Sequence, residues 1–466
     1  MSDVLHLPPV RVAYFLGIGG IGMSALARHA LALGWTVGGY DKTPSPLTDA
    51  LAQEGAWFTT DERVEALPPV FNQPNDVLVV WTPAVPAHHP QRIHFASSGF
   101  ACFKRAEVLA AWANEGICVA VGGTHGKTTT SSLLAWILHQ ANTGARAFLG
   151  GIATNFGSNR VAGTGPITVV EADEFDRSFL HLRPRIALVT STDADHLDIY
   201  GTAEGARLAF EAFAQITLQN GGTLLEADGL HLGGISYGVD LPDAPYRATS
   251  LRMEEGFQVF DLHLNGTDVY GVRAGLPGLH NIQNAVGAAA ASHLLGVSAE
   301  AIAAGIQSFR GVARRFDVRY RSAQAVYIDD YAHHPTEIRA ALSAARQLYP
   351  NKRMTVVFQP HLFTRTRDFL ADFALSLQMA DEVVLLPIYP ARELPLPGIS
   401  SETLANAFPE GQQPRVIMPD EVVDWTRQNQ PELLLTLGAG DIDRLVAPLE
   451  QLFSTGFQPL NSPQRP

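Results

Sequence analysis

The chain has 466 residues, of which 46% are hydrophobic, and a formal net charge of −13. This length exceeds what one hydrophobic core usually supports, so we expect two to four domains, with three of about 150 residues fitting best. An acidic chain without any basic block is not expected to bind nucleic acid by neutralising its phosphates.

Two further observations bear on the compartment. Only Cys102 and Cys118 occur, and Cys118 lies in an apolar run that is typical of a buried strand. The first residues show no basic segment followed by a cleavable apolar stretch. We therefore expect a cytoplasmic protein without a disulfide framework and without membrane insertion.

Short apolar runs alternate with longer segments of helical period, a pattern that predicts parallel sheets covered by helices. The alternation occurs three times, from residue 12 to about 112, from residue 117, and from about residue 326. Between about Gly221 and Val272, short strand-like pieces alternate with polar turns. This stretch predicts an antiparallel excursion from the central domain.

The first motif follows the apolar run VAYFL. Gly17, Gly19 and Gly22 have the G-x-G-x-x-G spacing. Such glycines permit a tight turn and let a diphosphate approach the amides that begin the next helix. A second run, WTVGGY, ends at Asp41, whose carboxylate can accept hydrogen bonds from a ribose or a base. The motif alone fits a nicotinamide site, a site for another nucleotide diphosphate, or close packing only.

A more specific motif, GGTHGKTTT, follows the run ICVAV and precedes an apolar helix. This is the context that a phosphate-binding loop requires. Loop amides would hold the β- and γ-phosphates of ATP, Lys127 would neutralise their charge, and Thr128 would offer its hydroxyl to Mg²⁺. Val121 stands where the usual eight-residue motif has glycine, so we expect a shorter variant anchored by Gly123.

Acidic residues follow two further apolar runs of this region, where an open parallel sheet places its ligands. They are Glu171, Asp173 and Glu174 in ITVVEADEFD, and Asp193 and Asp195, with His196, in IALVTSTDADHLD. Carboxylate oxygens suit Mg²⁺, whereas imidazole is a less usual ligand for so hard an ion. The residues alone therefore favour a magnesium site in which His196 is a bystander.

The segments GTHGKTTT, EADE, DADH, LHNIQNAVGAAA, GVARRFD and DDYAHHPTE occur in this order, and the chain thereby resembles the Mur ligase family over essentially its whole length. The resemblance implies an α/β protein of three domains. These would be a Rossmann-like domain for a UDP-sugar (1–115), a P-loop domain with a mostly parallel sheet for ATP and metal (116–321), and a Rossmann-like domain for an amino acid (322–466).

The resemblance also implies the reaction. GIGGIGMSALA and VFQPHLFTRTRDF look most like the members that attach L-alanine to UDP-N-acetylmuramate in peptidoglycan precursor synthesis. The implied ligands are UDP-N-acetylmuramate, ATP and L-alanine, with two Mg²⁺ sites in which Mn²⁺ can substitute, and we expect a monomer or a weak homodimer. The nearest alternative is a recycling ligase that attaches a tripeptide. A dehydrogenase and a P-loop switch or transport ATPase are alternatives of other classes.

Roles carry over from the resemblance motif by motif. The UDP-sugar would meet Gly17, Gly19, Gly20, Gly22, Asp41, Thr82 and Arg105. ATP would meet Gly123, Thr124, His125, Gly126, Lys127, Thr128, Thr129, Asn284, Arg315 and Asp330, with His280 near the adenine or the substrate. Thr128, Glu171 and His196 would hold metal, and Tyr331, His333 and Arg365 would bind the amino acid. The catalytic set would be Lys127, Glu171, His196, Asn281 and Arg315.

Several of these residues have plainer interpretations. Asn281 or Asn284 could cap a helix. Arg314 and Arg315 could be a solvated pair, although a guanidinium also suits phosphate. Arg365 could be a surface charge. A metal cluster of Asp329, Asp330, His333 and His334 is a further alternative. The chain departs from the family at Ser191, where relatives often have asparagine, and at Leu362, where many have arginine. Phe210 stands where several sister ligases carry a carbamylated metal-binding lysine.

Overall fold

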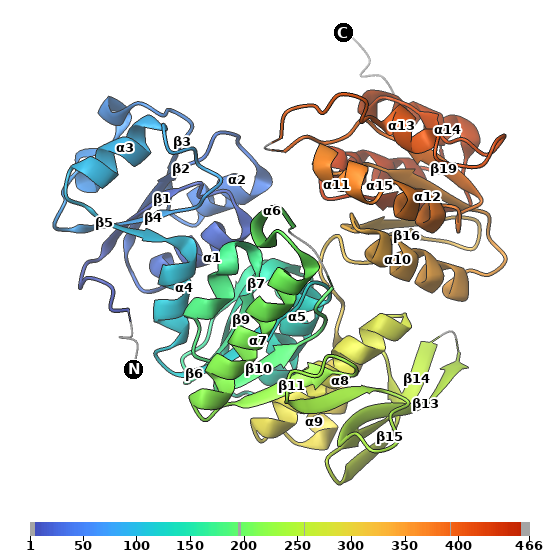
Figure 1. The fold of residues 1–466 in the computed structure, drawn as a ribbon, viewed down its shortest axis with the longest axis horizontal. Coiled ribbons are helices and arrows are strands. Elements are labelled where there is room, and N and C mark those ends of the chain that lie inside the picture. The colour runs from blue at the N-terminus through green and yellow to red at the C-terminus, as the bar shows by residue number, and fades with distance from the viewer. Residues whose placement is uncertain (1–4, 194–196, 256, 392, 458–466) are drawn as a thin grey trace. The chain divides into compact units, whose positions relative to one another are not determined.

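The computed structural model describes residues 5–193, 197–255, 257–391 and 393–457. By their internal contacts these residues form two compact units, which divide between Leu276 and Pro277, between His280 and Asn281, and between Arg310 and Gly311. The first unit holds a five-stranded and a ten-stranded sheet, and the second holds a six-stranded sheet (Figure 1). Most neighbouring strands pair in parallel, so the predicted α/β class is confirmed.

The first sheet is parallel and has the order β3-β2-β1-β4-β5. Its strands are β1 (Val12–Leu16), β2 (Thr36–Tyr40), β3 (Trp57–Thr59), β4 (Val77–Trp81) and β5 (Ala101–Lys104), and its helices are α1 (Ile21–Ala32), α2 (Pro46–Gln53), α3 (Pro90–Ser97) and α4 (Arg105–Ala113). Phe15 packs on one face and Tyr14 on the other. The strand order reverses at β1, so the carboxyl ends of β1 and β4 flank the crevice where such sheets bind ligands.

The central sheet continues the same unit in the order β15-β14-β13-β12-β11-β10-β6-β9-β7-β8. Its first strands are β6 (Ile117–Gly122), β7 (Arg146–Ala153), β8 (Ser158–Val161), β9 (Ile167–Ala172) and β10 (Ile186–Val189). They are followed by β11 (Thr223–Ala227), β12 (Ile235–Val239), β13 (Tyr246–Glu254), β14 (Phe257–Leu264) and β15 (Thr267–Arg273). The helices are α5 (Lys127–Gln140), α6 (Leu197–Tyr200), α7 (Ala203–Gln219), α8 (Leu279–Leu294) and α9 (Ala299–Ser308).

The expected antiparallel excursion is only partly correct. β13, β14 and β15 pair antiparallel, as predicted. β11 and β12 instead extend the parallel sheet, and the prediction is wrong for them. Polar turns in the sequence mark where a strand ends, but they do not show whether the next strand runs parallel or antiparallel to it. That direction depends on which strand it pairs with, and the pairing is not encoded in the turn.

The second unit contains a sheet of order β16-β17-β21-β18-β19-β20. Among its described strands, only β16 pairs antiparallel with its neighbour. Its strands are β16 (Asp317–Arg321), β17 (Val326–Asp330), β18 (Met354–Phe358), β19 (Glu382–Leu385), β20 (Arg415–Val416) and β21 (Leu433–Leu437). Its helices are α10 (Pro335–Leu348), α11 (Phe363–Asp368), α12 (Leu370–Leu377), α13 (Ser401–Ala405), α14 (Val422–Asn429) and α15 (Val446–Ser454). Separate hydrophobic clusters cover the two faces of this sheet.

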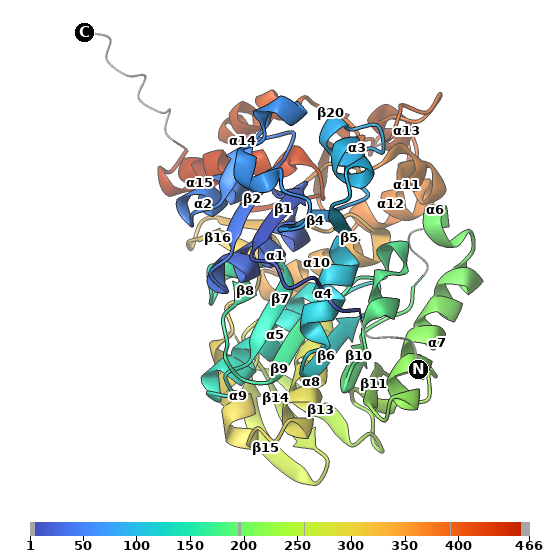
Figure 2. The ribbon, with the colours of Figure 1, turned by 90° about the vertical axis from the view of Figure 1, so that its left-hand side faces the viewer.

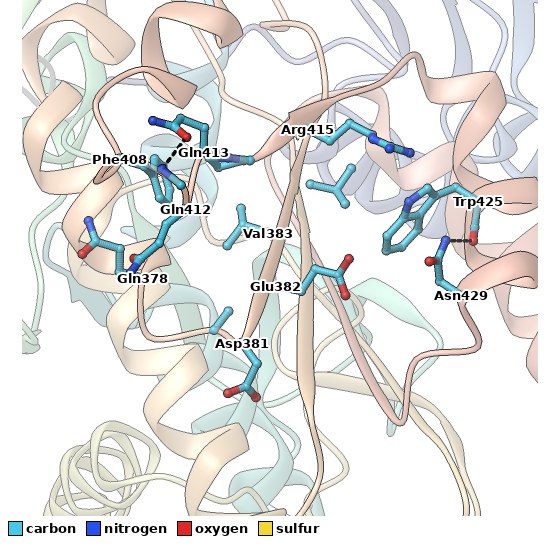
Figure 3. A pocket seen from close by; sticks show the side chains of 14 residues that line it. Gln378, Asp381, Glu382, Val383, Phe408, Gln412, Gln413, Arg415, Trp425 and Asn429 are labelled. Atoms are coloured by element: carbon cyan, nitrogen blue, oxygen red, sulfur yellow. Dashed lines mark hydrogen bonds between the residues drawn. The ribbon is translucent and has the colours of Figure 1, made fainter.

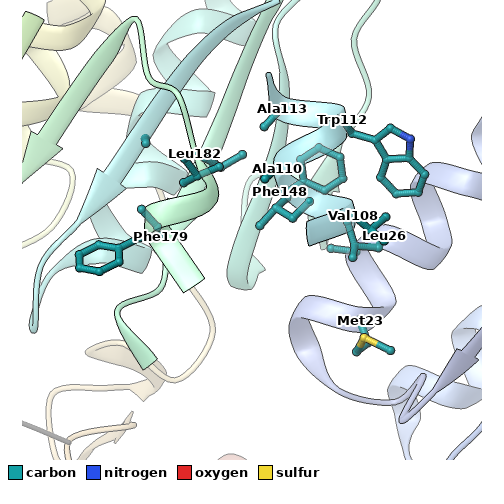
Figure 4. Close-up of a cluster of buried hydrophobic side chains, with 14 of the residues drawn as sticks. Met23, Leu26, Val108, Ala110, Trp112, Ala113, Phe148, Phe179 and Leu182 are labelled. Carbon is teal, nitrogen blue, oxygen red and sulfur yellow. The ribbon is translucent and has the colours of Figure 1, made fainter. Parts of the chain in front are cut away.

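One hydrophobic cluster joins the first sheet to the central sheet. Met23 and Leu26 of α1, Trp112 of α4 and Phe148 of β7 belong to it (Figure 4), and α1 lies against β7 and β8 (Figure 2). The buried Asn159 side chain completes the contact, since its amide donates to Ile21 O at 2.6 Å and to Ser24 Oγ at 2.9 Å. The two sheets are therefore packed as parts of one compact unit. Among the described helices, none combines the length and the apolar character needed to cross a bilayer.

Candidate active site

The glycine-rich turn lies at the carboxyl end of β1. Gly17 has a φ of +88°, and a Cβ atom there would lie 2.8 Å from Thr82 Cγ2. The Gly19 amide donates to Asp41 Oδ2 at 2.9 Å. The first backbone bond within α1 runs from Ser24 N to Gly20 O, so the preceding amides begin a helix whose N-terminus is suited to an anion.

Arg105 reaches this turn from the first residue of α4. A Cβ atom at Gly22 would lie 2.9 Å from Arg105 Nη1, so the guanidinium lies directly against this glycine. Arg105 Nη2 also lies 2.9 Å from Asp173 Oδ2, in the acidic segment that follows β9. The structure thus brings together the residues that the sequence analysis assigned to the UDP-sugar, namely Gly17, Gly19, Gly20, Gly22, Asp41, Thr82 and Arg105.

The phosphate-loop motif connects β6 to α5 through two glycines of positive φ. Gly123 has a φ of +132° and Gly126 a φ of +82°. A Cβ atom at Gly126 would lie 2.6 Å from Asn284 Oδ1, so Asn284 borders the loop. Asn281 lies one turn earlier in the same helix, and both asparagines are buried. They are the third and sixth residues of α8, so neither is its N-cap residue.

A neighbouring segment, 190–193, holds the loop from the other side. The Ser191 hydroxyl accepts a hydrogen bond from His125 N at 2.8 Å, and Thr124 Oγ1 donates to Asp193 O at 2.8 Å. Ser191 is one of the departures from the family pattern, and its hydroxyl supplies an acceptor for a loop amide. Asp195 and His196 lie outside the described residues.

Lys127 begins α5 and turns back over the loop. Its ammonium group donates to Gly123 O at 2.6 Å and lies 2.8 Å from Glu174 Oε2. Burial alone would lower the pKa of Lys127, but the carboxylates of Glu174, Glu171 and Asp173 outweigh it and the pKa is raised. The lysine therefore stays protonated at neutral pH and remains a cation for phosphate. Sequence analysis did not identify Glu174 as its partner.

Glu171 is the penultimate residue of β9, next to the loop. Its Oε1 accepts from Thr128 Oγ1 at 2.9 Å, and its Oε2 accepts from Gly150 N at 2.9 Å. A carboxylate and a hydroxyl that meet in this way offer the hard oxygen donors that Mg²⁺ prefers, so these residues fit the ion. Within the described part of the chain, no group of three or more His, Cys, Asp or Glu side chains could hold a metal. Phosphate oxygens and water would have to complete the shell.

Phe210 packs into the hydrophobic core from α7. It is 1% exposed, and its ring lies edge-on to Phe179 at 5.4 Å between centroids. No lysine occurs between Pro184 and Asn220. We therefore expect turnover to be unchanged when bicarbonate and carbon dioxide are removed from the assay, as measured by ADP release in degassed buffer. A rate that recovers on adding bicarbonate would contradict this expectation.

In the second unit, predicted residues gather at the carboxyl end of β17. Asp330 accepts from Phe316 N at 2.6 Å and from Ala332 N at 2.7 Å. The Arg315 guanidinium lies over the Tyr331 ring at 4.9 Å. Glu337, which the sequence analysis did not single out, lies 3.8 Å from Arg315 and 3.3 Å from the His333 ring. Arg315, Asp330, Tyr331 and His333 are thus neighbours, as their common motif suggested.

The other interpretations of this region do not fit the contacts. Arg314 is not half of a solvated pair, because its Nε lies 3.1 Å from the fully buried Asp329 carboxylate. His334 caps α10 by accepting from Thr336 N. Asp329 and His334 are thus used structurally, which disfavours the four-residue metal cluster. Arg365 is 8% exposed within α11 and is not a surface charge. It follows Leu362, whose φ is +70°.

Asp330 should make stability depend on pH. Burial raises its pKa from 3.8 to about 6, although Arg315 and the two amides oppose this shift. A raised pKa favours the protonated folded state, so this contribution is complete below about pH 4 and is lost as the pH rises through about 6. Relative to Asp330→Asn, the wild-type free energy of unfolding should fall by about 2 kcal/mol between pH 4 and pH 7. Urea titrations at several pH values measure this free energy. If it depended on pH in the same way in the wild type and in Asp330→Asn, the expectation would be refuted.

A cavity of about 450 Å³ lies beside β19 and β20 of the C-terminal sheet, away from the carboxyl end of β17 (Figure 3). Glu382, at the amino end of β19, lies in it together with Gln412, Arg415 and Trp425. None of the predicted site residues that the structure describes lines it. Parallel sheets of this kind bind their ligands at the carboxyl ends of the strands, where Asp330 lies, so the cavity is not part of the candidate site.

Comparison with known proteins agrees with this arrangement. The chain matches models described as Mur ligase family, catalytic domain (residues 12–116), Mur ligase middle domain (121–292), and Mur ligase, glutamate ligase domain (314–440). A UDP-N-acetylmuramate–L-alanine ligase of Porphyromonas gingivalis is 46% identical over 452 residues, which cover 95% of this chain and 99% of that protein.

Solved structures show the same fold. A UDP-N-acetylmuramate–alanine ligase of Thermotoga maritima has a TM-score of 0.79 and 27% identity, and the match covers 95% of this chain and 99% of that one. A murein peptide ligase of Psychrobacter arcticus has a TM-score of 0.70 and 23% identity, with coverage of 97% and 100%. By its sequence matches and by its three-domain α/β architecture, the chain belongs to the Mur ligase family.

Proposed function

We propose that this chain is an ATP-dependent ligase that joins the lactyl carboxylate of UDP-N-acetylmuramate to L-alanine, a step of peptidoglycan precursor synthesis. The observation that carries the proposal is the pairing of a glycine-rich turn with a phosphate loop in one compact unit, bridged by Arg105 and Asp173. Relatives that carry the name of this reaction match nearly the whole chain, which supports the same assignment.

The first half-reaction would take place mainly on residues of the first unit. The UDP diphosphate would lie on the N-terminus of α1 beside Gly17, Gly19, Gly20 and Gly22, with Asp41, Thr82 and Arg105 around it. A lactyl carboxylate oxygen attacks the γ-phosphorus of ATP, ADP leaves, and an acyl phosphate forms. The loop 123–126, Lys127, Thr128 and Thr129 would hold the transferring phosphoryl group, and Asn281 and Asn284 would orient the reactants.

Glu171, Thr128 and His196 are the residues that would hold Mg²⁺. When bound, the ion would neutralise charge that develops on the phosphoryl oxygens. His280 would lie near the adenine or the substrate, Asp330 would contact a ribose hydroxyl, and Arg315 would contact phosphate. The three domains would span residues 1–115, 116–321 and 322–466.

The second half-reaction needs the amino acid. Arg365 would bind the carboxylate of L-alanine, with Tyr331 and His333 near its amine. The amine nitrogen attacks the acyl carbon, a proton is lost, and the tetrahedral intermediate collapses to an amide and inorganic phosphate. We also propose that the enzyme works in the cytoplasm as a monomer or weak homodimer, binds no nucleic acid, and uses two Mg²⁺ ions that Mn²⁺ can replace.

A coupled assay of ADP release tests the proposal. ATP, Mg²⁺ and UDP-N-acetylmuramate are supplied with L-alanine, glycine, L-serine, D-glutamate or the tripeptide in parallel. L-Alanine should give the highest kcat/KM, and glycine and L-serine should be poorer but active, since one methyl or hydroxyl group is worth only about 1–3 kcal/mol. The highest value with the tripeptide would assign the recycling reaction instead. ADP release without any amino acid would point to an ATPase, and reduction of a nicotinamide to a dehydrogenase.

A further inference from the structure

The two cations that the proposed function assigns to substrate phosphates are already paired with carboxylates. Asp173 and Glu174 are consecutive residues that follow β9. Asp173 Oδ2 lies 2.9 Å from Arg105 Nη2, on the side of the glycine-rich turn. Glu174 Oε2 lies 2.8 Å from Lys127 Nζ, on the side of the phosphate loop. Neither carboxylate has a part in the chemistry proposed above.

The Lys127–Glu174 pair is buried. The Glu174 side chain is 4% exposed and that of Lys127 is 14% exposed. The ammonium group also donates to two loop carbonyls, Gly123 O at 2.6 Å and Thr124 O at 3.3 Å. A charge in such a place requires a partner of opposite sign, because leaving one member of a buried pair alone is strongly unfavourable. Lys127 therefore needs an anion whether the loop is empty or filled.

The Arg105–Asp173 pair is more exposed, at 20% and 37% for the two side chains. Exposed ion pairs are weak, so this pair should be easier to open than the buried one. The guanidinium lies against Gly22, where a Cβ atom would come within 2.9 Å of Arg105 Nη1. Arg105 is thus placed beside the N-terminus of α1, where an anion is favoured.

We propose that Glu174 and Asp173 are internal counter-ions that occupy Lys127 and Arg105 in the ligand-free enzyme and compete with the phosphates of ATP and of the UDP-sugar. The inference rests on the proposed function, because that function names the two ligands. A substrate must displace a carboxylate from each cation, and it can do so only if other contacts contribute. Nucleotides bring a base and a ribose, whereas free phosphate does not, so the pairs would discriminate against inorganic phosphate.

The test is equilibrium binding to the full chain by isothermal titration calorimetry. ATP is titrated in EDTA, where no turnover can occur, and UDP and inorganic phosphate are titrated separately. Glu174→Gln and Asp173→Asn each remove one negative charge. Glu204→Gln is the matched control. Glu204 pairs with Arg207 on the exposed side of α7, so this substitution removes the same charge from an ion pair outside the site.

Glu174→Gln should bind ATP about tenfold more tightly than wild type, because a competing charge-assisted hydrogen bond is gone. It should also bind inorganic phosphate measurably, and its affinity for UDP should be unchanged. Asp173→Asn should tighten UDP binding by up to about fivefold, as expected for a more exposed pair. Glu204→Gln should behave as wild type with all three ligands.

A merely structural role predicts the opposite sign, since loss of the pair would disorder the site and weaken binding. Equal or weaker ATP binding by a folded Glu174→Gln protein, as judged by its thermal melting, would overturn the inference. If that variant does not fold, the inference is tested by UDP binding to Asp173→Asn. Unchanged or weaker UDP binding by that variant would then overturn the inference. Wild-type protein that binds neither ATP nor UDP would refute the proposed function, which is a distinguishable result.

Discussion

Lys127→Ala should reduce ligase turnover by about a thousandfold or more while the chain stays folded, because a cation at a transferring phosphoryl group acts mainly in the transition state. The side chain lies over the phosphate loop and contacts Glu174 and loop carbonyls, not the hydrophobic core. ADP release with all three substrates measures the effect, and circular dichroism with thermal melting checks the fold.

The same substitution removes the ammonium group that lies 2.8 Å from the buried Glu174 carboxylate. Burial already raises the pKa of Glu174, so its carboxyl group can take up a proton and limit the loss of stability. Lys352→Ala is a suitable control, because that lysine donates to Ala323 O and Gln324 O in the second unit. Near-normal ADP release by Lys127→Ala would show that the loop does not carry the reacting phosphates.

Glu171→Gln is expected to have the next largest effect, a loss of about a hundredfold or more, since a metal ion contributes several kcal/mol of charge stabilisation and the amide binds it poorly. The amide keeps the shape of the carboxylate and an acceptor for Thr128 Oγ1 or Gly150 N. The Mg²⁺ concentration that gives half-maximal activity should rise, which separates a lost ligand from a general defect.

Glu211→Gln, on α7, removes the same charge from an ion pair with Arg207 and should leave the Mg²⁺ dependence unchanged. An unaltered Mg²⁺ titration for Glu171→Gln, together with normal turnover, would exclude Glu171 from the metal shell. Replacement of Mg²⁺ by Mn²⁺ in the same titration shows whether the weakened site still accepts a divalent ion.

Much of the fold could be predicted because its signals are local. Apolar runs of strand length, helical periodicity and the glycines at 17, 123 and 126 each indicate a structure within a few neighbouring residues. The burial of Cys118 in β6 follows from the same kind of signal. The parallel pairing of β11 and β12 was missed because strand direction depends on a partner elsewhere in the chain.

The site was predictable in its residue types and less so in its pairings. Lys127 and Glu174 are far apart in the sequence, and only the parallel neighbours β6 and β9 bring their segments together. The Gly150 amide that supports Glu171 is a backbone group, which no side-chain pattern signals. The sequence does not decide whether Arg365 is a ligand or a surface charge. Its burial depends on how α11 packs, and a short polar helix does not indicate which of its residues are buried.

The hydrophobic cluster that joins the first two sheets has a consequence for evolution by recombination. The rings of Trp112 and Phe148 stack within this cluster, and Arg28 Nη1 donates a hydrogen bond to Asn159 Oδ1 beside it. A segment that ends at a junction near residue 115 and is exchanged between relatives would carry one half of this cluster into a protein that supplies the other half. Relatives could therefore exchange one of these two segments only if the contacting residues of the other changed as well. The second unit has hydrophobic clusters of its own, so its exchange would not require such matched changes.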